Sequence, residues 1–380
     1  MIPSSGGGAG HVKRVSLYRL SFFTVRAEME KAGMNGYERI RAVLERREPD
    51  MVPMMEWSIA PNVREALFPG CNDEPEFAEL MGLDGVTAKM PAQLGGASNL
   101  PDRFTNQWGV VMQRTTEDYA PVDGPIKFAA DLDVYSPPDP ENEENYEGLR
   151  DVVSRFKGEK FIFWHSRAEF MTACELRGMA DFLMDLMADP ELAHRVLRVV
   201  NEYCCRIAVQ AIERGADGVM LGDDWAYNEG PFMSPAKFEE FILPYFRNMV
   251  QTVKAAGGYV VKHCDGYVWP LMDMVVDSGI DGMNPIEPAA GMDIAAMKER
   301  YGDRISLLGN IDCGKTLSEA PVSQVVAEVK DAIRQAGPGG GYMLMSSNSI
   351  HTSVRPENYR AMVEATRKFG RYPLDMAALA

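Results

Sequence analysis

Apolar runs of strand length alternate along this chain with longer segments whose apolar residues recur at helical spacing. Such alternation is typical of parallel strands joined by crossover helices, and eight units predict a single closed (β/α)8 barrel, a TIM barrel. The expected strands are 51–57, 83–90, 160–166, 217–225, 258–266, 281–288, 304–312 and 341–348. The expected helices are 37–47, 176–214, 235–256, 267–279, 293–302, 319–336 and 356–369.

Two segments fall outside this pattern, and the barrel itself is expected over residues 36–375. Residues 1–35 are interpreted as a Gly/Ser-rich leader followed by a short N-terminal segment, with a short helix expected at 15–33. Residues 91–158 are rich in Pro, Gly, Asn and acids, and 108–114 reads as one strand of a small antiparallel unit. We interpret 91–158 as an insertion near the mouth of the barrel.

Composition narrows the class of protein. A chain of 380 residues fits one barrel of about 250 residues with insertions. The net charge of -16 argues against nucleic acid or an anionic membrane as a partner, since both need a basic face. The six cysteines form no Cys-x-x-Cys pair, which is typical of a reduced, cytoplasmic protein. No apolar run approaches the ~20 residues of a membrane span, so no membrane association is expected.

Polar side chains gather where the expected strands end. In a (β/α)8 barrel the active site is built at these C-terminal ends, while the strand bodies pack the core. The polar residues at these positions are Glu56, Lys89, His165, Asp223, Asp224, His263, Asp265, Asn284, Glu287, Asn310, Asp312, Ser347 and Asn348. Their convergence on one ring supports both the fold and the place of the site.

In the stretch Val261-Lys262-His263-Cys264-Asp265-Gly266, three consecutive residues can bind a metal or transfer a proton. Side chains at positions i and i+2 of a strand share a face, so His263 and Asp265 are expected to point the same way. Cys264 is expected to point toward the helix layer and to pack as a small buried hydrophobe. His263 and Asp265 are therefore the candidate pair for catalysis or metal binding.

Structural roles remain open for several of these residues. A histidine at a strand end, such as His165, can be a hydrogen-bonded structural residue. One of Asp223 and Asp224 can cap the turn that follows, because Asp favours such positions. Glu56 follows an apolar run, and a carboxylate there is costly unless it is paired or protonated. Glu287 is held stiffly between prolines and is a candidate ligand.

Several blocks of the sequence resemble the uroporphyrinogen decarboxylase superfamily. They are ADGVMLGDDWAYNEGPFMSPAKFEEFILPYFRNMV, the His-x-Asp-Gly strand end, GIDGMNPIEPAAGMDIAAMKERYGDRISLLGNID and GGGYMLMSSNSIHTSVRPENYRAM, with GYERIRAVLERREPDMVPMMEW near the N-terminus. The resemblance covers roughly residues 36–370. It implies the (β/α)8 barrel and one of two activities: decarboxylation of uroporphyrinogen, or methyl transfer to or from a corrinoid.

The corrinoid-dependent methyltransferase branch fits these residues better. The decarboxylases of the superfamily carry an arginine-rich motif after the first strand, where this chain reads EWSIAPN. Thiol-activating members bind zinc with a His-x-Cys pair and a later Cys, and those positions fall on His263, Asp265 and about Asn348. Carboxylate and amide oxygens are harder ligands than thiolates and suit activation of an oxygen.

The resemblance thus implies an O-demethylase. Such an enzyme takes the methyl group of a methyl ether, such as a methoxylated aromatic, to the Co(I) corrinoid of a partner protein. The expected catalytic residues are His263, Asp265, Glu56, Asp223 and Asp224. The expected substrate-binding residues are Trp57, His165, Trp225, Asn310, Met345 and Asn348. The expected ligands of a possible zinc ion are His263, Asp265, Glu287 and Asn348.

Other functions remain open. The chain has no corrinoid-binding Asp-x-His-x-x-Gly motif, so the corrinoid is expected on a separate protein, and a homodimer is implied by family analogy. A decarboxylase or lyase acting on a smaller acid would use cationic anchors, for which Lys89, Arg167 and Lys262 are candidates. A methylcobalamin-dependent thiol methyltransferase and a non-enzymatic corrinoid-binding barrel are further alternatives.

Overall fold

The computed structural model describes residues 33–71, 73–90, 101–115 and 119–380. The expected leader and almost all of the helix expected at 15–33 lie outside the described residues.

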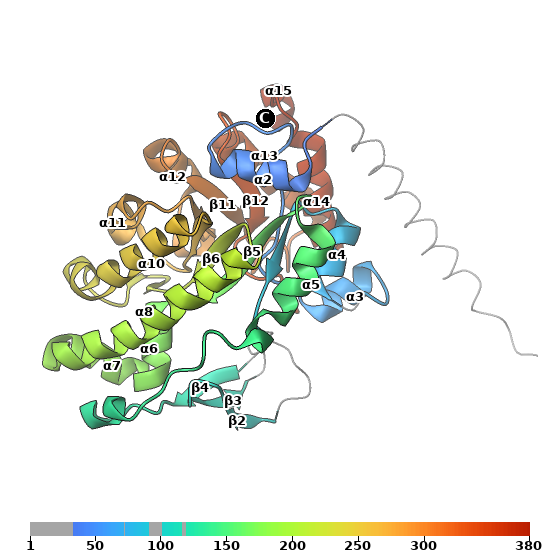
Figure 1. Cartoon of the computed structure of the whole chain (residues 1–380). Coiled ribbons are helices and arrows are strands. Elements are labelled where there is room, and N and C mark those ends of the chain that lie inside the picture. The colour runs from blue at the N-terminus through green and yellow to red at the C-terminus, as the bar shows by residue number, and fades with distance from the viewer. Residues whose placement is uncertain (1–32, 72, 91–100, 116–118) are drawn as a thin grey trace, which may run out of the picture.

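A parallel sheet of seven strands curls around the core, and its strands follow the order of the chain (Figure 1). Each neighbouring pair is hydrogen-bonded in parallel register, as the alternation with helices predicted. The strands are β1 (Gly85–Ala88), β5 (Phe161–Arg167), β6 (Gly218–Gly222), β9 (Tyr259–His263), β10 (Gly282–Asn284), β11 (Ser306–Ile311) and β12 (Tyr342–Ser346).

The segment expected as the first strand closes the gap between β12 and β1 without becoming a regular strand. Leu344 N donates to Pro53 O at 3.0 Å on one side, and Asp84 N donates to Met54 O at 2.8 Å on the other. Pro53 has no N–H to donate, so the pairing is reduced to isolated bridges such as Met54 with Leu344. The predicted (β/α)8 barrel is confirmed, and the segment 51–57 completes it as an irregular strand.

Helices surround the strands, and α2 lies across the N-terminal end of the barrel. The expected helix at 176–214 is three helices, because Gly178 has a φ of 90° and Pro190 starts the last of them. The helices that bear on the barrel are α2 (Gly36–Leu44), α3 (Pro61–Leu67), α4 (Glu74–Met81), α5 (Glu147–Phe156), α6 (Glu169–Arg177), α7 (Met179–Ala188), α8 (Pro190–Glu213), α10 (Leu243–Ala255), α11 (Met272–Asp277), α12 (Ile294–Tyr301), α13 (Val322–Ala336) and α14 (Pro356–Phe369).

The described part of 91–158 contains a three-stranded antiparallel sheet made of β2 (Arg103–Thr105), β3 (Val111–Arg114) and β4 (Tyr119–Asp123). Figure 1 shows this small sheet at the end of the molecule opposite α2. It is joined to the barrel where Ile126 N donates to Leu176 O of α6 at 3.0 Å. The helix α5 follows and leads directly into β5.

Side-chain alternation divides the core into an inner and an outer part. The inner part holds the residues that point into the barrel, together with α2 residues that close its end: Ile40, Val43, Leu44, Met55, Phe161, Phe163, Met220, Val261, Leu308, Met343 and Met345. The outer part holds their sequence neighbours, such as Trp164, Leu221 and Leu344, between the strands and the helices. The same alternation decides which way each polar strand end points.

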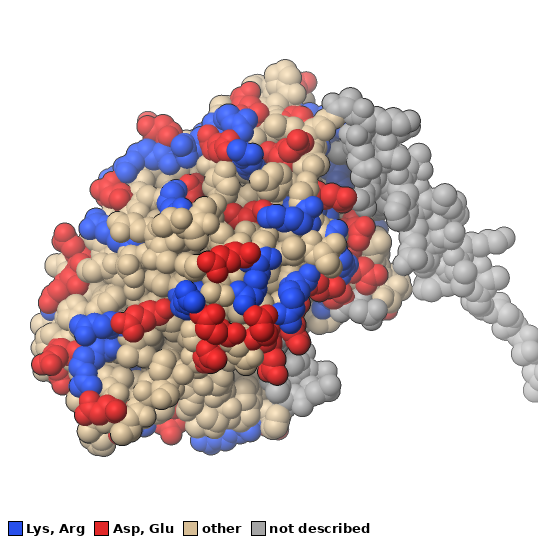
Figure 2. Space-filling view, in the orientation of Figure 1, with Lys and Arg blue, Asp and Glu red and all other residues tan. Residues whose placement is uncertain are grey.

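The surface carries both signs of charge. On the face seen in Figure 2, Lys and Arg lie interspersed with Asp and Glu, and no broad basic area is visible there. All six cysteines are buried and unpaired. Within the residues that the structure describes, no helix combines the length and the hydropathy needed to cross a membrane.

Candidate active site

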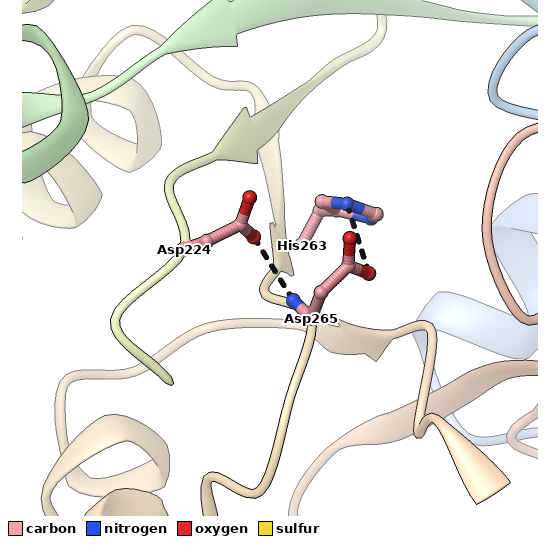
Figure 3. A group of neighbouring side chains, drawn as sticks. All are labelled: Asp224, His263 and Asp265. Carbon is pink, nitrogen blue, oxygen red and sulfur yellow. Dashed lines mark hydrogen bonds and ion pairs between the residues drawn. The ribbon is translucent and has the colours of Figure 1, made fainter. Parts of the chain in front are cut away.

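Asp224, His263 and Asp265 form a cluster at the ends of β6 and β9 (Figure 3). One ligand atom from each side chain lies within 4.8 Å of the others. His263 Nε2 is 3.5 Å from Asp265 Oδ1, and Asp224 Oδ1 accepts a hydrogen bond of 2.9 Å from Asp265 N. The expectation that His263 and Asp265 share a face is confirmed.

The amide of Asn284 sets the tautomer of His263. Asn284 Nδ2 donates to Leu308 O at 3.1 Å, so its Oδ1 faces His263 Nδ1 at 2.6 Å and must accept from it. Because Nδ1 carries a proton in this contact, Nε2 is the ring nitrogen that faces Asp265. A ring nitrogen prepared in this way is the usual metal-ligating arrangement of histidine.

Asp265 has one satisfied and one unsatisfied oxygen. Its Oδ2 accepts a 2.6 Å hydrogen bond from Asn348 Nδ2, whereas its Oδ1 is buried without a hydrogen-bond partner. Burial raises the pKa of Asp265 to about 6; the charges of Asp224 and Glu287 act in the same direction, and His263 opposes them. An unpartnered buried carboxylate oxygen calls for a proton or a cation.

The donor set of the cluster fits a divalent cation. An imidazole nitrogen and two carboxylates suit zinc and other first-row metals, and Asn284 supplies the outer hydrogen bond that such histidines need. Two of the ligands expected from the sequence have other contacts. Glu287 accepts from Gly266 N at 2.8 Å, and the Asn348 amide nitrogen faces Asp265. The structure brings Asp224 to the cluster in their place.

Two aromatic residues expected to bind substrate lie against the cluster. The Trp57 ring stacks on His263 with centroids 4.3 Å apart and is tilted on His165 at 4.1 Å. Beside them is Gly222, where a Cβ would lie 3.0 Å from His165 Nε2 and 3.2 Å from Trp57. Burial lowers the pKa of His165 well below its usual value, so this ring is neutral.

Met345 and Asn310 support the site without joining the cluster. Met345 Sδ lies 3.5 Å from Asn284 Nδ2, within the inner core. Asn310 Nδ2 donates to Ile286 O at 3.2 Å. Ile286 has a φ of 60°, a conformation that β-branched residues rarely adopt, so Asn310 holds strained backbone next to Glu287.

Glu56 lies on the other face of its segment from Met55 and Trp57. Its Oε2 is 2.6 Å from Ser346 Oγ, and burial raises its pKa to about 8 although hydrogen bonds from Ser346 oppose the shift. Ser346 Oγ also contacts Asn348 O but has only one hydrogen. When Glu56 is protonated it can donate to Ser346 in turn, and Ser346 then donates to Asn348, whose side chain holds Asp265.

Asp223, Trp225 and Cys264 point toward the helix layer, away from the cluster. Asp223 accepts from Phe170 N at 3.1 Å, Met171 N at 2.7 Å and Trp225 Nε1 at 2.8 Å, so it anchors the start of α6. Trp225 is buried against aromatic residues of η4 (Phe238–Ile242) and α10 and does not reach the cluster. Cys264 Sγ accepts from Trp225 N at 3.2 Å, which confirms its predicted outward orientation.

The candidate anchors for an acidic substrate are all engaged elsewhere. Lys89 pairs with Glu74 at 3.1 Å, and Arg167 pairs with Glu175 at 2.6 Å. Lys262 is fully buried on the outer face of β9. The groups around the cluster are instead mostly acidic.

Sequence reasoning missed the roles of Asn284 and Ser346. Asn284 was recognised only as a polar strand end, yet it pairs in register with His263 across β9 and β10. Strand order alone would have placed these two positions side by side. Ser346 carries no comparable signal, because its contact with Glu56 joins segments 290 residues apart in sequence.

The fold and the site define a (β/α)8 barrel with an acidic, imidazole-containing cluster at its strand ends. Comparison with known proteins identifies the family of the chain. The uroporphyrinogen decarboxylase (URO-D) family model matches residues 106–369, and the chain belongs to this family of enzymes.

Its relatives and its structural neighbours carry different names. A uroporphyrinogen decarboxylase of Colwellia psychrerythraea is 24% identical over 263 residues, covering 65% of this chain and 70% of the relative. One of Alkalilimnicola ehrlichii is 27% identical over 267 residues, covering 65% and 68%. A methyltransferase from Methanosarcina mazei shares the fold with a TM-score of 0.71 at 22% identity, covering 88% of this chain and 99% of that one.

Proposed function

We propose that this protein is a methyltransferase that takes a methyl group from a methyl ether, such as a methoxylated aromatic, to the Co(I) corrinoid of a partner protein. The observation that carries the proposal is the cluster of Asp224, His263 and Asp265 with its unpartnered carboxylate oxygen. The fold shared with a methyltransferase of the same architecture is compatible with it.

The chemistry requires charge stabilisation on oxygen. When the ether bond breaks, its electron pair stays on oxygen, the corrinoid supplies the pair for the new bond to carbon, and the phenolate formed takes up a proton. A divalent cation bound by the cluster would stabilise the negative charge on that oxygen as a Lewis acid. Asn284 and Asn348 hold His263 and Asp265 for this purpose.

The surroundings favour a neutral aromatic donor. Trp57 and His165 place aromatic rings directly beside the cluster, and an aromatic donor prefers stacked or tilted contacts with such rings. Asp224, Asp265 and Glu287 make the region acidic. A tetrapyrrole with many carboxylates would meet these acids instead of cations.

Decarboxylation of a smaller acid is the second candidate, and the names of the relatives favour it. A decarboxylase would need cationic side chains to hold the acid. Lys89 and Arg167 are instead paired with glutamates and Lys262 is buried, which argues against this function.

An anaerobic incubation with reduced corrinoid protein distinguishes the two. The purified chain is offered a panel of methoxylated aromatics and of aromatic and aliphatic carboxylic acids, and products are identified by mass spectrometry while bound metal is measured. A demethylated phenol in amounts that require the corrinoid protein supports the proposal. Carbon dioxide release without corrinoid, and no phenol, would replace it with the decarboxylase.

A further inference from the structure

Lys262 is a fully buried lysine directly behind the cluster. It precedes His263 on β9 and therefore points away from the barrel interior, toward α6 and α10. Its amino group lies 3.9 Å from the centre of the Trp225 ring, a cation–π contact. Burying a charged amine costs free energy unless the amine is paired or hydrogen-bonded. The polar contacts of Lys262 must therefore offset that cost.

Those contacts reach the backbone of both strands that carry the cluster. Lys262 Nζ donates to Asp223 O and, at 2.5 Å, to His263 O. Asp223 O belongs to the peptide that leads into Asp224. His263 O belongs to a cluster residue and also accepts from Asp223 N at 3.3 Å. One amino group thus ties the ends of β6 and β9 together where the cluster side chains leave them.

Two buried carboxylates share this space. Asp223 and Glu169 both lie on the outer side, and the charge of Lys262 lowers the pKa of each, while burial raises it. Glu169 Oε1 accepts from Asn201 Nδ2 at 2.6 Å, and its Oε2 has no partner. Lys262 is therefore the cation that balances the acids behind the cluster.

We infer that Lys262 is a positioning residue of the cluster: by joining Asp223 O to His263 O it sets the separation of the Asp224 and His263 side chains. The inference rests on the proposed role of the cluster as a metal site. Residues that orient metal ligands from outside typically change metal affinity about 10- to 100-fold when replaced.

The test compares Lys262→Met with Lys160→Met. Lys160 is also buried and donates to a backbone carbonyl, Leu83 O, but at the start of β5, the opposite end of the barrel. Zinc affinity is measured by chelator competition, geometry by the visible spectrum of the Co²⁺-loaded chain, and folding by thermal unfolding. Lys262→Met is expected to weaken zinc binding about ten-fold or more and to alter the Co²⁺ spectrum, whereas Lys160→Met leaves both unchanged.

A second variant covers a failure to fold. Lys262→Gln replaces the ammonium donors with those of a shorter, uncharged amide, and it is expected to fold and to show the same losses in part. If a folded Lys262 variant keeps the zinc affinity and Co²⁺ spectrum of the unsubstituted chain, the inference is wrong and the proposed function stands. If the unsubstituted chain binds no metal at the cluster, the inference and the metal site fail together.

Discussion

Neighbouring residues at the ends of β6 and β9 have different contacts because consecutive side chains point to opposite sides of the strand. Asp224, His263 and Asp265 face the cluster, while Asp223 and Cys264 face the helix layer. The sequence predicted this division for His263, Cys264 and Asp265. It could not choose between Asp223 and Asp224, because both follow the strand and only the N–H groups of α6 decide between them.

Asp223 and Asp224 form a matched pair for mutation. Asp224→Asn is expected to lower metal affinity at least about ten-fold with little change in thermal stability, since it removes a negative ligand. Asp223→Asn is expected to destabilise the fold by about 1–3 kcal/mol, because an amide cannot accept from all three buried N–H donors. Metal titration and denaturant unfolding of both variants check this. Reversed outcomes would mean that the two aspartates have been assigned to the wrong faces.

Glu56→Gln separates a supporting role from direct acid catalysis. Because Glu56 has a pKa of about 8 and is neutral below it, the amide is expected to keep the contact with Ser346 and to retain the rate at pH 7 within about ten-fold. The unsubstituted enzyme should lose activity as pH rises through about 8, and Glu56→Gln should not. A loss of about 10²- to 10⁴-fold at pH 7 would instead identify Glu56 as the proton donor.

Stability should follow the same titration. The folded pKa of Glu56 is raised from 4.5 to about 8, so its stabilising contribution is fully present below about pH 4.5 and is lost as pH rises through about 8. Unfolding free energies of the unsubstituted chain and of Glu56→Gln, measured between pH 5 and 9, should therefore diverge, with the wild-type residue the less favourable at high pH. Parallel pH dependences would show that Glu56 is not buried as a neutral acid.

Among the elements, the strands of the parallel sheet could be predicted because each is an apolar run, and most of these runs are separated by helical patterns. The segment 51–57 was predicted as a regular strand from its apolar residues, but Pro53 has no N–H to donate and the segment forms only isolated bridges. The expected helix at 176–214 failed for a related reason: helical spacing of apolar residues continues across Gly178 and Pro190, and only backbone geometry ends α6 and α7 there.

The end of β6 provides an element-level test of the aromatic wall. Gly222→Ala would place a Cβ 3.0 Å from His165 Nε2 and 3.2 Å from Trp57, so these rings must shift by a few tenths of an ångström. The expected result is a several-fold higher KM for the aromatic donor with unchanged metal affinity. Steady-state kinetics and tryptophan fluorescence measure it, and an unaltered KM would remove Trp57 and His165 from the binding surface.

The cap of α2 offers a contrasting control. Asn35 Oδ1 accepts from Glu38 N at 2.9 Å, and Glu38 accepts in return from Asn35 N. Asn35→Ala is expected to reduce the free energy of unfolding by about 1 kcal/mol and to leave methyl transfer unchanged, because α2 lies at the end of the barrel away from the cluster. Loss of activity in a folded Asn35→Ala chain would show that the two ends are coupled.

For the molecule as a whole, the class of fold followed from the sequence, and the position of the candidate site followed from the fold. What the sequence could not provide was the set of long-range contacts: Asn284 to His263, Asn348 to Asp265 and Ser346 to Glu56. These contacts join strands that are distant in the chain, and they turn a ring of polar strand ends into one cluster with defined donors and acceptors.

We have proposed that this cluster moves a methyl group from an ether to a corrinoid. The most direct measurement of this transfer is the absorbance change of a reduced corrinoid protein from Co(I) to methyl-Co(III), followed anaerobically with a methoxylated aromatic and the unsubstituted chain, His263→Ala or Cys264→Ser. We expect the change with the unsubstituted chain and with Cys264→Ser, and none with His263→Ala. Equal rates with His263→Ala, or no change with any methyl ether, would contradict it.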